Sequence, residues 1–188
     1  MIKDLFNKNL LIDSERFTLR PIHKSDVEDI FEIFSDKEVM KYYDLLPFSS
    51  IEDAIAQVDI FRKSFEDKSM IRWGIELKEN KKIIGTCGFF AFSEDSMKAE
   101  MGYELNRNYW NSGIMSEALR LIIEFIFSQT KINRIEAYVE PQNIASMKLL
   151  ETLKFTKEGL LRQYERCRGE LIDITIWGLL RNDYLLFY

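Results

Sequence analysis

The spacing of apolar and polar residues changes several times along the chain, and each change predicts a new element of structure. Residues 16–20 alternate between polar and apolar, which predicts a short strand. Two amphipathic helices follow, beginning near Ser25 and Ser49, and each serine precedes a glutamate by three positions, Glu28 and Glu52. This spacing is typical of a capping box at a helix start.

The middle of the chain predicts a meander of three strands. Residues 71–77 and 99–105 alternate, whereas residues 83–92 are apolar on both faces and therefore indicate a central strand. A helix over 113–130 is apolar nearly all round, which favours burial against a sheet. A strand at 135–139, a helix at 143–153 and strands near 155–164 and 170–177 complete the order βαα-βββ-α-β-α-ββ. We expect one mixed α/β domain over residues 1–188.

The composition restricts the class of protein to which the chain can belong but does not identify it. The chain has 188 residues, of which 46% are hydrophobic and 30% charged, and these values suit one domain with a full core. Its formal charge of −5 argues against a nucleic-acid partner, because phosphate backbones need a basic face. No signal-peptide pattern and no apolar run of about 20 residues occurs, so we expect a cytoplasmic protein without a membrane partner.

Several kinds of chemistry are excluded by the scarcity of their residues. His23 is the only histidine, and the two cysteines, Cys87 and Cys167, lie far apart in sequence. These residues make neither a disulfide framework nor an ordinary zinc site, so no metal is expected. The chain also lacks the G-x-x-x-x-G-K-[ST] and G-x-G-x-x-G loops of nucleotide-binding proteins.

The segment 109–118, Y-W-N-S-G-I-M-S-E-A, lies between a predicted strand and the start of the buried helix. Free N–H groups and the helix dipole make such a place suitable for a phosphate. Gly113 would let the backbone approach closely, and Ser112 and Ser116 could add hydroxyl donors. An ordinary strand-to-helix turn, with glycine for geometry and serine for capping, explains the same residues.

This segment resembles the pyrophosphate loop of GNAT acetyltransferases, Q/R-x-x-G-x-G/A. It is most similar to the form Y-W-G-K-G-x-A-x-E-A of the ribosomal-protein alanine N-acetyltransferase branch. Among the positions that depart from that form, two bear on phosphate binding: Asn111 replaces a glycine, and Met115 replaces a small residue and would crowd a phosphate unless it points into the core. Five positions match: Tyr109, Trp110, Gly113, Glu117 and Ala118.

Further segments resemble the same family in the same order along nearly the whole chain. They are R-F-T-L-R-P at 16–21 followed by Asp26, M-G-Y-E-L at 101–105, N-I-A-S at 143–146, E-G-L-L-R at 158–162, and Gly169 with Asp173. The resemblance implies a GNAT fold, a mixed twisted sheet of about seven strands with splayed central strands and helices on both faces. It also implies an N-acetyltransferase that carries acetyl from acetyl-CoA to a primary amine.

The resemblance assigns expected roles to particular residues. The pantetheine arm of acetyl-CoA is expected to pair with the backbone of Tyr103, Glu104 and Leu105, and Asn143 is expected to contact it. Ser146 is expected to donate a proton to the leaving thiolate. The residues expected at the pyrophosphate are Trp110, Asn111, Ser112, Gly113, Ile114, Met115 and Ser116.

Asn143 and Ser146 have a second interpretation, as an N-cap and the third residue of a helix. Ser146 also shares a helical stripe with three leucines at 149, 150 and 153, which places its hydroxyl on an apolar face. A buried hydroxyl needs a hydrogen-bond partner, either a carbonyl one turn back or the thiol or an amide of CoA.

An amine acceptor is mostly protonated at neutral pH, so a carboxylate near it would serve as base. Glu165, 19 residues after Ser146, is the candidate, because a glutamate with this spacing is implicated in the branch that the chain resembles. Glu104 is the alternative, and a solvated carboxylate is the ordinary state of either. The aromatic segment from Tyr42 to Phe48 lies where the family places the acceptor pocket, although a locally packed loop explains it as well.

The acceptor itself stays open at this point. The first candidate is an N-terminal alanine of a protein, and the alternatives are a polyamine, an amino acid or an aminoglycoside. A macromolecular acceptor would need an open groove, whereas a small polyamine would need a closed acidic pocket. A non-catalytic acyl-CoA-binding domain is the rival class, and it could dispense with Glu165 and Ser146. The apolar residues 184–188 suggest docking on the core or on a second copy in a homodimer.

Overall fold

The computed structural model describes residues 2–187, with side chains to 186, and its centre is one eight-stranded sheet. The prediction of a mixed α/β sheet with about seven strands is confirmed, and the additional strand is the two-residue β1. In spatial order the strands are β1 (Ile12–Asp13), β2 (Phe17–Pro21), β3 (Ile71–Leu77), β4 (Ile83–Ser93), β5 (Lys98–Leu105), β6 (Arg134–Val139), β8 (Glu170–Leu180) and β7 (Thr156–Cys167).

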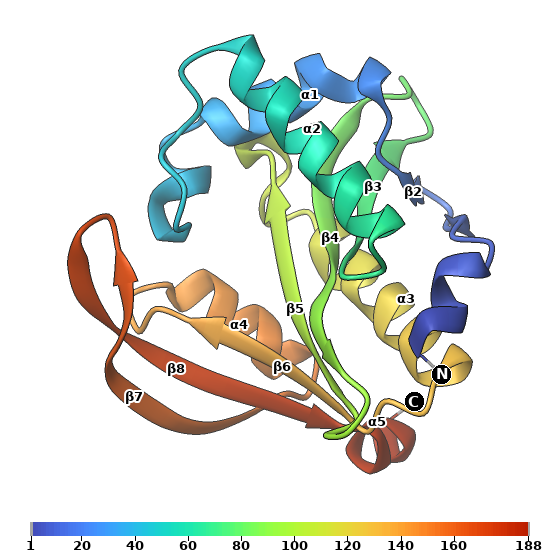
Figure 1. Ribbon diagram of the computed structural model, residues 1–188, viewed down its shortest axis with the longest axis vertical. Coiled ribbons are helices and arrows are strands. Elements are labelled where there is room, and N and C mark those ends of the chain that lie inside the picture. Colours follow the sequence, from blue (N-terminus) through green and yellow to red (C-terminus); the bar gives the residue numbers. More distant parts are fainter. Residues whose placement is uncertain (1, 188) are drawn as a thin grey trace.

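The sheet opens between β5 and β6, its one parallel pair among the described strands. The two strands pair only where residues 98–100 meet residues 134–136, and every other neighbouring pair is antiparallel. Beyond those three pairs β5 and β6 diverge, which leaves a V-shaped gap in the ladder (Figure 1). The expected splay of the central strands is therefore present.

Helices cover both faces of the sheet and make two apolar cores. α1 (Val27–Ser35) and α2 (Ile51–Glu66) pack over Ile22 and Ile83, whereas α3 (Ile114–Gln129) and α4 (Ile144–Thr152) pack on the opposite face. β4 serves both cores, since Ile83 faces one and Ile84 the other. This double burial explains the strand's apolar residues on both faces.

The predicted capping boxes lie two residues and one residue away from the observed ones. A short 3₁₀ turn, η2 (Lys24–Asp26), precedes α1, and its carboxylate at Asp26 accepts a hydrogen bond from the N–H of His23 at 2.7 Å. α2 likewise begins after Ser50, whose N–H donates to Asp53 at 3.1 Å. In both cases a nearby aspartate, and not the predicted glutamate, accepts the N–H of the capping residue.

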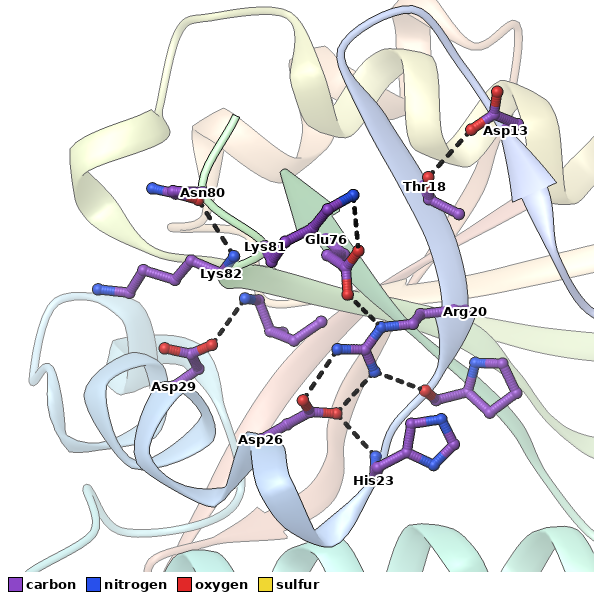
Figure 2. A network of polar contacts seen from close by, with 12 residues as sticks. Asp13, Thr18, Arg20, His23, Asp26, Asp29, Glu76, Asn80, Lys81 and Lys82 are labelled. Atoms are coloured by element: carbon purple, nitrogen blue, oxygen red, sulfur yellow. Dashed lines mark hydrogen bonds and ion pairs between the residues drawn. The ribbon is translucent and has the colours of Figure 1, made fainter. Parts of the chain in front are cut away.

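Asp26 serves the fold in a second way, through Arg20 on β2. The guanidinium of Arg20 bonds both oxygens of Asp26, at 2.7 and 2.9 Å, and Glu76 on β3 at 2.5 Å (Figure 2). Burial alone would raise the pKa of Asp26, but the hydrogen bonds from Arg20 and His23 hold it below its ordinary value. The Arg…Asp part of the sequence pattern is thus a structural clamp between the sheet and α1.

The two ends of the chain add elements that the pattern did not predict. A 3₁₀ helix, η1 (Ile2–Asn7), inserts Leu5 and Phe6 into the larger core. At the other end α5 (Arg181–Phe187) packs Tyr184 on Phe127, while Leu185 and Leu186 stay exposed. Residue 188 lies outside the described residues. Within residues 2–187, every helix is too short or too polar to cross a membrane.

Candidate active site

A cavity of about 1120 Å³ occupies the gap between β5 and β6. Its walls come from those two strands, the start of α3, the start of α4, the β7–β8 hairpin and the loop around the 3₁₀ helix η3 (Val39–Tyr42). Residues from distant parts of the sequence therefore meet at the place where the sheet is open. Every predicted site residue except Ser112 lines this cavity.

The loop before α3 adopts the geometry that a close backbone approach requires. Gly113 is the N-cap of α3 with a φ of +78°, and Asn111 also has a positive φ, +57°. Glycine and asparagine are the residues that tolerate this region best, which explains why asparagine can replace the family's glycine. The first N–H groups of α3 lack intrahelical partners and face the cavity end of the helix.

Met115 does not crowd this loop. Its side chain is only 6% exposed and belongs to the larger apolar core, together with Ile114 and Ala118. The bulk that distinguishes this chain from the family's pattern therefore lies inside the protein. The backbone N–H of Met115 remains at the helix start, where a phosphate would be bound.

Hydrogen bonds within the loop alter the expected roles of two residues. The hydroxyl of Ser112 donates to the carbonyl of Tyr109 at 2.5 Å, so its proton is engaged inside the loop. Of the two serines considered as phosphate donors, only Ser116 lines the cavity. The indole of Trp110 donates to the carbonyl of Leu105 at 2.8 Å and ties the loop to β5.

Arg16 holds the same loop from outside. Its guanidinium donates to the carbonyl of Ser112 at 2.9 Å and forms an ion pair with Glu117 of α3 at 2.5 Å. The first arginine of the R-x-x-L-R-P segment thereby connects β2 to the phosphate loop. Sequence reasoning matched this arginine to the family but gave it no function.

Ser146 finds its partner across the gap in the sheet. Its hydroxyl lies 2.6 Å from that of Tyr103 on β5, so neither partner considered from the sequence, a carbonyl one turn back or CoA, is the observed one. Burial raises the pKa of Tyr103 to about 12, although the bond to Ser146 works against the rise. The phenol is therefore protonated at neutral pH.

Asn143 acts as the N-cap of α4. Its side-chain oxygen accepts the N–H of Ser146 at 3.1 Å, as the helix-start interpretation predicts. The residue is half-buried and also lines the cavity. Within residues 2–187 its amide nitrogen makes no hydrogen bond, so that donor is available to a ligand.

Glu104 lies deep in the cavity wall and is held by two donors. One of its oxygens accepts hydrogen bonds from Arg72 and, at 2.5 Å, from Thr86. Burial alone would lower the pKa of Arg72, but the charge of Glu104 more than offsets this effect. A proton on Glu104 would leave the buried guanidinium without its counter-charge, which disfavours Glu104 as a base.

Glu165 differs from Glu104 in its position, its exposure to solvent and its hydrogen bonding. It lies on β7 beside a bulge, is exposed, and within residues 2–187 forms no hydrogen bond or ion pair. Burial raises the pKa values of Glu100 and Glu140, and the charge of Glu165 adds to both shifts, so each of these carboxylates lies near Glu165. The sequence analysis missed Glu100, although it shares a face of β5 with Glu104 by alternation.

The loop after η3 closes the cavity on the side of these carboxylates. Arg168 in the β7–β8 turn donates to the carbonyls of Met40 and Tyr43, at 2.6 and 2.7 Å. Burial, and then the charge of Glu104, raise the pKa of Tyr43, whose ring lines the cavity. Phe48 instead stacks on Phe34, with ring centroids 5.1 Å apart, so only part of the aromatic segment faces the site.

Comparison with known proteins assigns this architecture to a family. A family model described as an acetyltransferase (GNAT) domain matches residues 16–156. The chain is 40% identical to the uncharacterized N-acetyltransferase p20 of Bacillus licheniformis, over 91% of this chain and 96% of that protein. It is 24% identical to the ribosomal protein uS5-alanine N-acetyltransferase of Escherichia coli, over 92% of each chain.

Solved structures agree with the sequence comparison. A GNAT-family acetyltransferase from Bacillus anthracis superposes with a TM-score of 0.81 at 26% identity, over 92% of this chain and 99% of that one. The microcin C7 self-immunity acetyltransferase MccE, solved with acetyl-CoA and AMP, has a TM-score of 0.81 at 20% identity, over 89% and 93% of the two chains. The chain therefore belongs to the GNAT family of acetyltransferases, and it is an N-acetyltransferase that uses acetyl-CoA.

Proposed function

We propose that residues 1–188 form one domain in which a primary amine attacks the acetyl thioester directly, in a ternary complex. The observation that carries this proposal is the gap between β5 and β6. It has free helix N–H groups at one end and unpaired carboxylates on its other walls. A chain that bound both substrates in one cavity would need no covalent acetyl-enzyme. Of the two thiols, that of Cys87 is buried in the core, and that of Cys167, which lines the cavity, has its pKa raised by burial and is a poor thiolate nucleophile.

The proposed reaction accounts for each proton that is lost or gained. The amine nitrogen bonds to the carbonyl carbon, the carbon–sulfur bond breaks, and Glu165 takes the proton released from the amine. Ser146 gives its proton to the departing thiolate and regains one from solvent water through the hydroxyl of Tyr103, which is protonated at neutral pH. Glu165 releases the proton that it took to solvent, which restores the enzyme. Backbone N–H groups of residues 103–105 stabilise the negative charge that develops on the carbonyl oxygen.

The role of Glu165 is tested by the substitution Glu165→Gln. We expect kcat to fall by about 100-fold or more, as for loss of a general base, while the Kd of acetyl-CoA stays within twofold. Glu170→Gln is the matched control, because Glu170 is an exposed glutamate of the same hairpin outside the cavity. An unchanged kcat in Glu165→Gln would remove Glu165 as the base.

For the acceptor we propose two candidates, each favoured by a separate observation. A protein N-terminal alanine is favoured by the activity named for the E. coli relative. A small cationic amine is favoured by the acidic wall formed by Glu100, Glu140 and Glu165. A cytoplasmic location and a homodimer stay predictions.

The first experiment is calorimetric titration with acetyl-CoA, followed by thiol release in the presence of amine acceptors of both kinds. Binding with thiol release for at least one amine supports the proposal. Binding without release for any amine would support the non-catalytic acyl-CoA-binding alternative instead.

A further inference from the structure

The side chain of Arg72 lies across the sheet and reaches from β3 to β5. Its register partner on β4 is Gly88, which in turn pairs with Gly102 on β5. A Cβ on Gly88 would lie only 2.0 Å from the carbonyl oxygen of Ile71. A Cβ on Gly102 would lie 3.3 Å from Nη1 of Arg72. The two glycines therefore leave a path on which the guanidinium can pass over the intervening strand.

The guanidinium of Arg72 is fixed by acceptors on two strands. Its Nε donates to the hydroxyl of Thr86 at 2.8 Å, its Nη1 to the carbonyl of Gly102 at 3.0 Å, and its Nη2 to the carboxylate of Glu104. Thr86 also donates to Glu104 at 2.5 Å. The side chains of Arg72 and Glu104 are 3% and 2% exposed, so water does not compete for these bonds. The rigid fork of arginine thus holds the carbonyl of Gly102 in one position.

This carbonyl belongs to a peptide whose N–H faces the cavity. Asn106 donates its N–H to the carbonyl of Ile84 on β4 at 2.8 Å, and bonded pairs alternate along an antiparallel ladder. By this alternation Gly102 turns its carbonyl toward β4, and Tyr103 turns its N–H away from β4. The planar trans peptide gives the same result, because its N–H and C=O point in opposite directions. Since β5 and β6 have diverged at this point, the N–H of Tyr103 points into the gap.

We propose that Arg72 is a positioning residue for acetyl transfer, and that it acts through the peptide between Gly102 and Tyr103. Its bond to the carbonyl fixes the plane of this peptide and polarises it, so the N–H of Tyr103 becomes a stronger and better aligned donor. That N–H then stabilises the negative charge on the thioester oxygen. The inference rests on the proposed function and deepens it, because it names the side chain behind one of the backbone donors.

The same arrangement explains why Glu104 is buried in the cavity wall. A buried guanidinium needs a counter-charge, and Glu104 supplies it from the strand that Arg72 holds. The pair is neutral as a whole, so Arg72 can polarise the peptide without adding net charge to the site where acetyl-CoA and the amine meet. Glu104 therefore serves the reaction through Arg72 and keeps its proton state throughout.

The test measures the hydrogen bond to the thioester itself, with acetyl-CoA that carries carbon-13 at the acetyl carbonyl. A hydrogen bond to a carbonyl oxygen weakens the C=O bond and lowers its infrared stretching frequency. We expect the label bound to the wild-type protein to absorb at a lower frequency than free acetyl-CoA. In Arg72→Met/Glu104→Gln most of this shift should be lost and kcat should fall about 10-fold, whereas the Kd of acetyl-CoA should stay within about twofold.

Two variants keep the test independent of folding. Arg72→Met/Glu104→Gln removes both buried charges together, which structures often tolerate. Gly102→Ala keeps the ion pair, but its Cβ would lie 3.3 Å from Nη1 of Arg72 and 3.1 Å from the ring of Phe90, so these groups must move and the bond to the carbonyl weakens. We expect a smaller loss of the infrared shift in this variant. Circular dichroism checks that each variant is folded.

The matched control is Arg134→Met/Glu158→Gln, because a similar arrangement occurs there outside the cavity. Arg134 on β6 reaches past Gly178 of β8 to Glu158 on β7, and a Cβ on Gly178 would lie 2.7 Å from its Nη1. Among residues 2–187 this guanidinium bonds to carboxylates and to no backbone carbonyl. We expect the control to keep the infrared band and the kcat of the wild type.

The outcomes separate this inference from the proposed function, because the infrared comparison needs no amine. A wild-type shift that is lost in the double variant and kept in the control would support the role of Arg72. If no amine were acetylated, the proposed function alone would have failed. A double variant with the band of the wild type would overturn the inference whatever its kcat, since Arg72 would then support only the fold.

Two further results would also overturn the inference. Loss of the shift in the control would trace it to the sheet in general and not to Arg72. A wild-type band at the frequency of free acetyl-CoA would show that the N–H of Tyr103 does not bind the carbonyl, while thiol release with an amine would still uphold acetylation.

Discussion

Removal of Arg16 tests whether the phosphate loop is positioned from outside the cavity. The Arg16 guanidinium holds the carbonyl of Ser112 at 2.9 Å and Glu117 at 2.5 Å, on either side of Gly113. Without these bonds the loop keeps the bond between Ser112 and Tyr109 and the bond from Trp110 to Leu105 of β5. We therefore expect Arg16→Ala to weaken the binding of acetyl-CoA while the sheet and both cores stay intact.

The size of the effect follows from the exposure of the pair. The side chains of Arg16 and Glu117 are 43% and 35% exposed, so solvent screens the ion pair and it contributes about 0.2–1 kcal/mol. The bond to the carbonyl of Ser112 adds about 1 kcal/mol. A loss of about 1–2 kcal/mol in loop positioning corresponds to a rise in Kd of about 5- to 30-fold.

Calorimetric titration of acetyl-CoA measures this change directly. Arg62→Ala is the matched control, because Arg62 is also 43% exposed and also pairs with a carboxylate, Asp59, but lies on α2 away from the loop. Glu117→Gln should raise Kd in the same direction by a smaller factor. Arg16→Ala with the Kd of the wild type would refute the positioning role. A large effect in Arg16→Ala with none in Glu117→Gln would indicate instead that Arg16 contacts the ligand itself.

Three further predictions concern the loop, the hydroxyl pair and the clamp. Gly113→Glu should abolish calorimetric binding of acetyl-CoA with the fold retained in circular dichroism. Gly169→Glu, at a similar φ of +91° in the open β7–β8 turn, should bind normally. Tyr103→Phe should lower kcat about 10-fold at unchanged acetyl-CoA Kd, because Ser146 loses its bonded hydroxyl. Asp26→Asn should lower the free energy of unfolding by about 2–4 kcal/mol at neutral pH, measured by urea titration. Since the folded-state pKa of Asp26 lies below its ordinary 3.8, the gap between wild type and Asp26→Asn should persist above that pH and narrow below it.

The strands and helices of the fold could be predicted from the local pattern of apolar residues, because each element buries one face against its neighbours. Alternation at 71–77 and the continuous apolar run from 83 predicted β3 and β4 with ends within one residue of those observed. Helix starts were harder to predict, since Asp26, and not the predicted Ser25 and Glu28, forms the observed turn by accepting the N–H of His23. The bonds from Arg20 that also hold Asp26 depend on the folded chain.

The residues that complete the site could not be predicted, because sheet order brings them together. Tyr103 and Ser146 are 43 residues apart, and Arg72 and Glu104 are 32 apart. The order β4-β5-β6-β8-β7 and the early end of the β5–β6 ladder set these contacts. The family resemblance suggested roles for Ser146 and Glu165 but none for Arg72 or Glu100, whose contacts and neighbours depend on the folded sheet.

The splayed sheet also resolves a conflict of charge within one small cavity. Acetyl-CoA brings several phosphate charges to a protein of net charge −5, yet none of residues 110–116 is basic. Neutral N–H groups of a helix start can bind phosphate without placing lysines beside the acidic wall, where they would neutralise it. Arg16 stays outside, bonded to Ser112 and Glu117, and strengthens the loop without entering the acceptor side. Under the proposed function, backbone N–H groups would bind the anion and carboxylates a cationic acceptor, so the two sites would not neutralise each other.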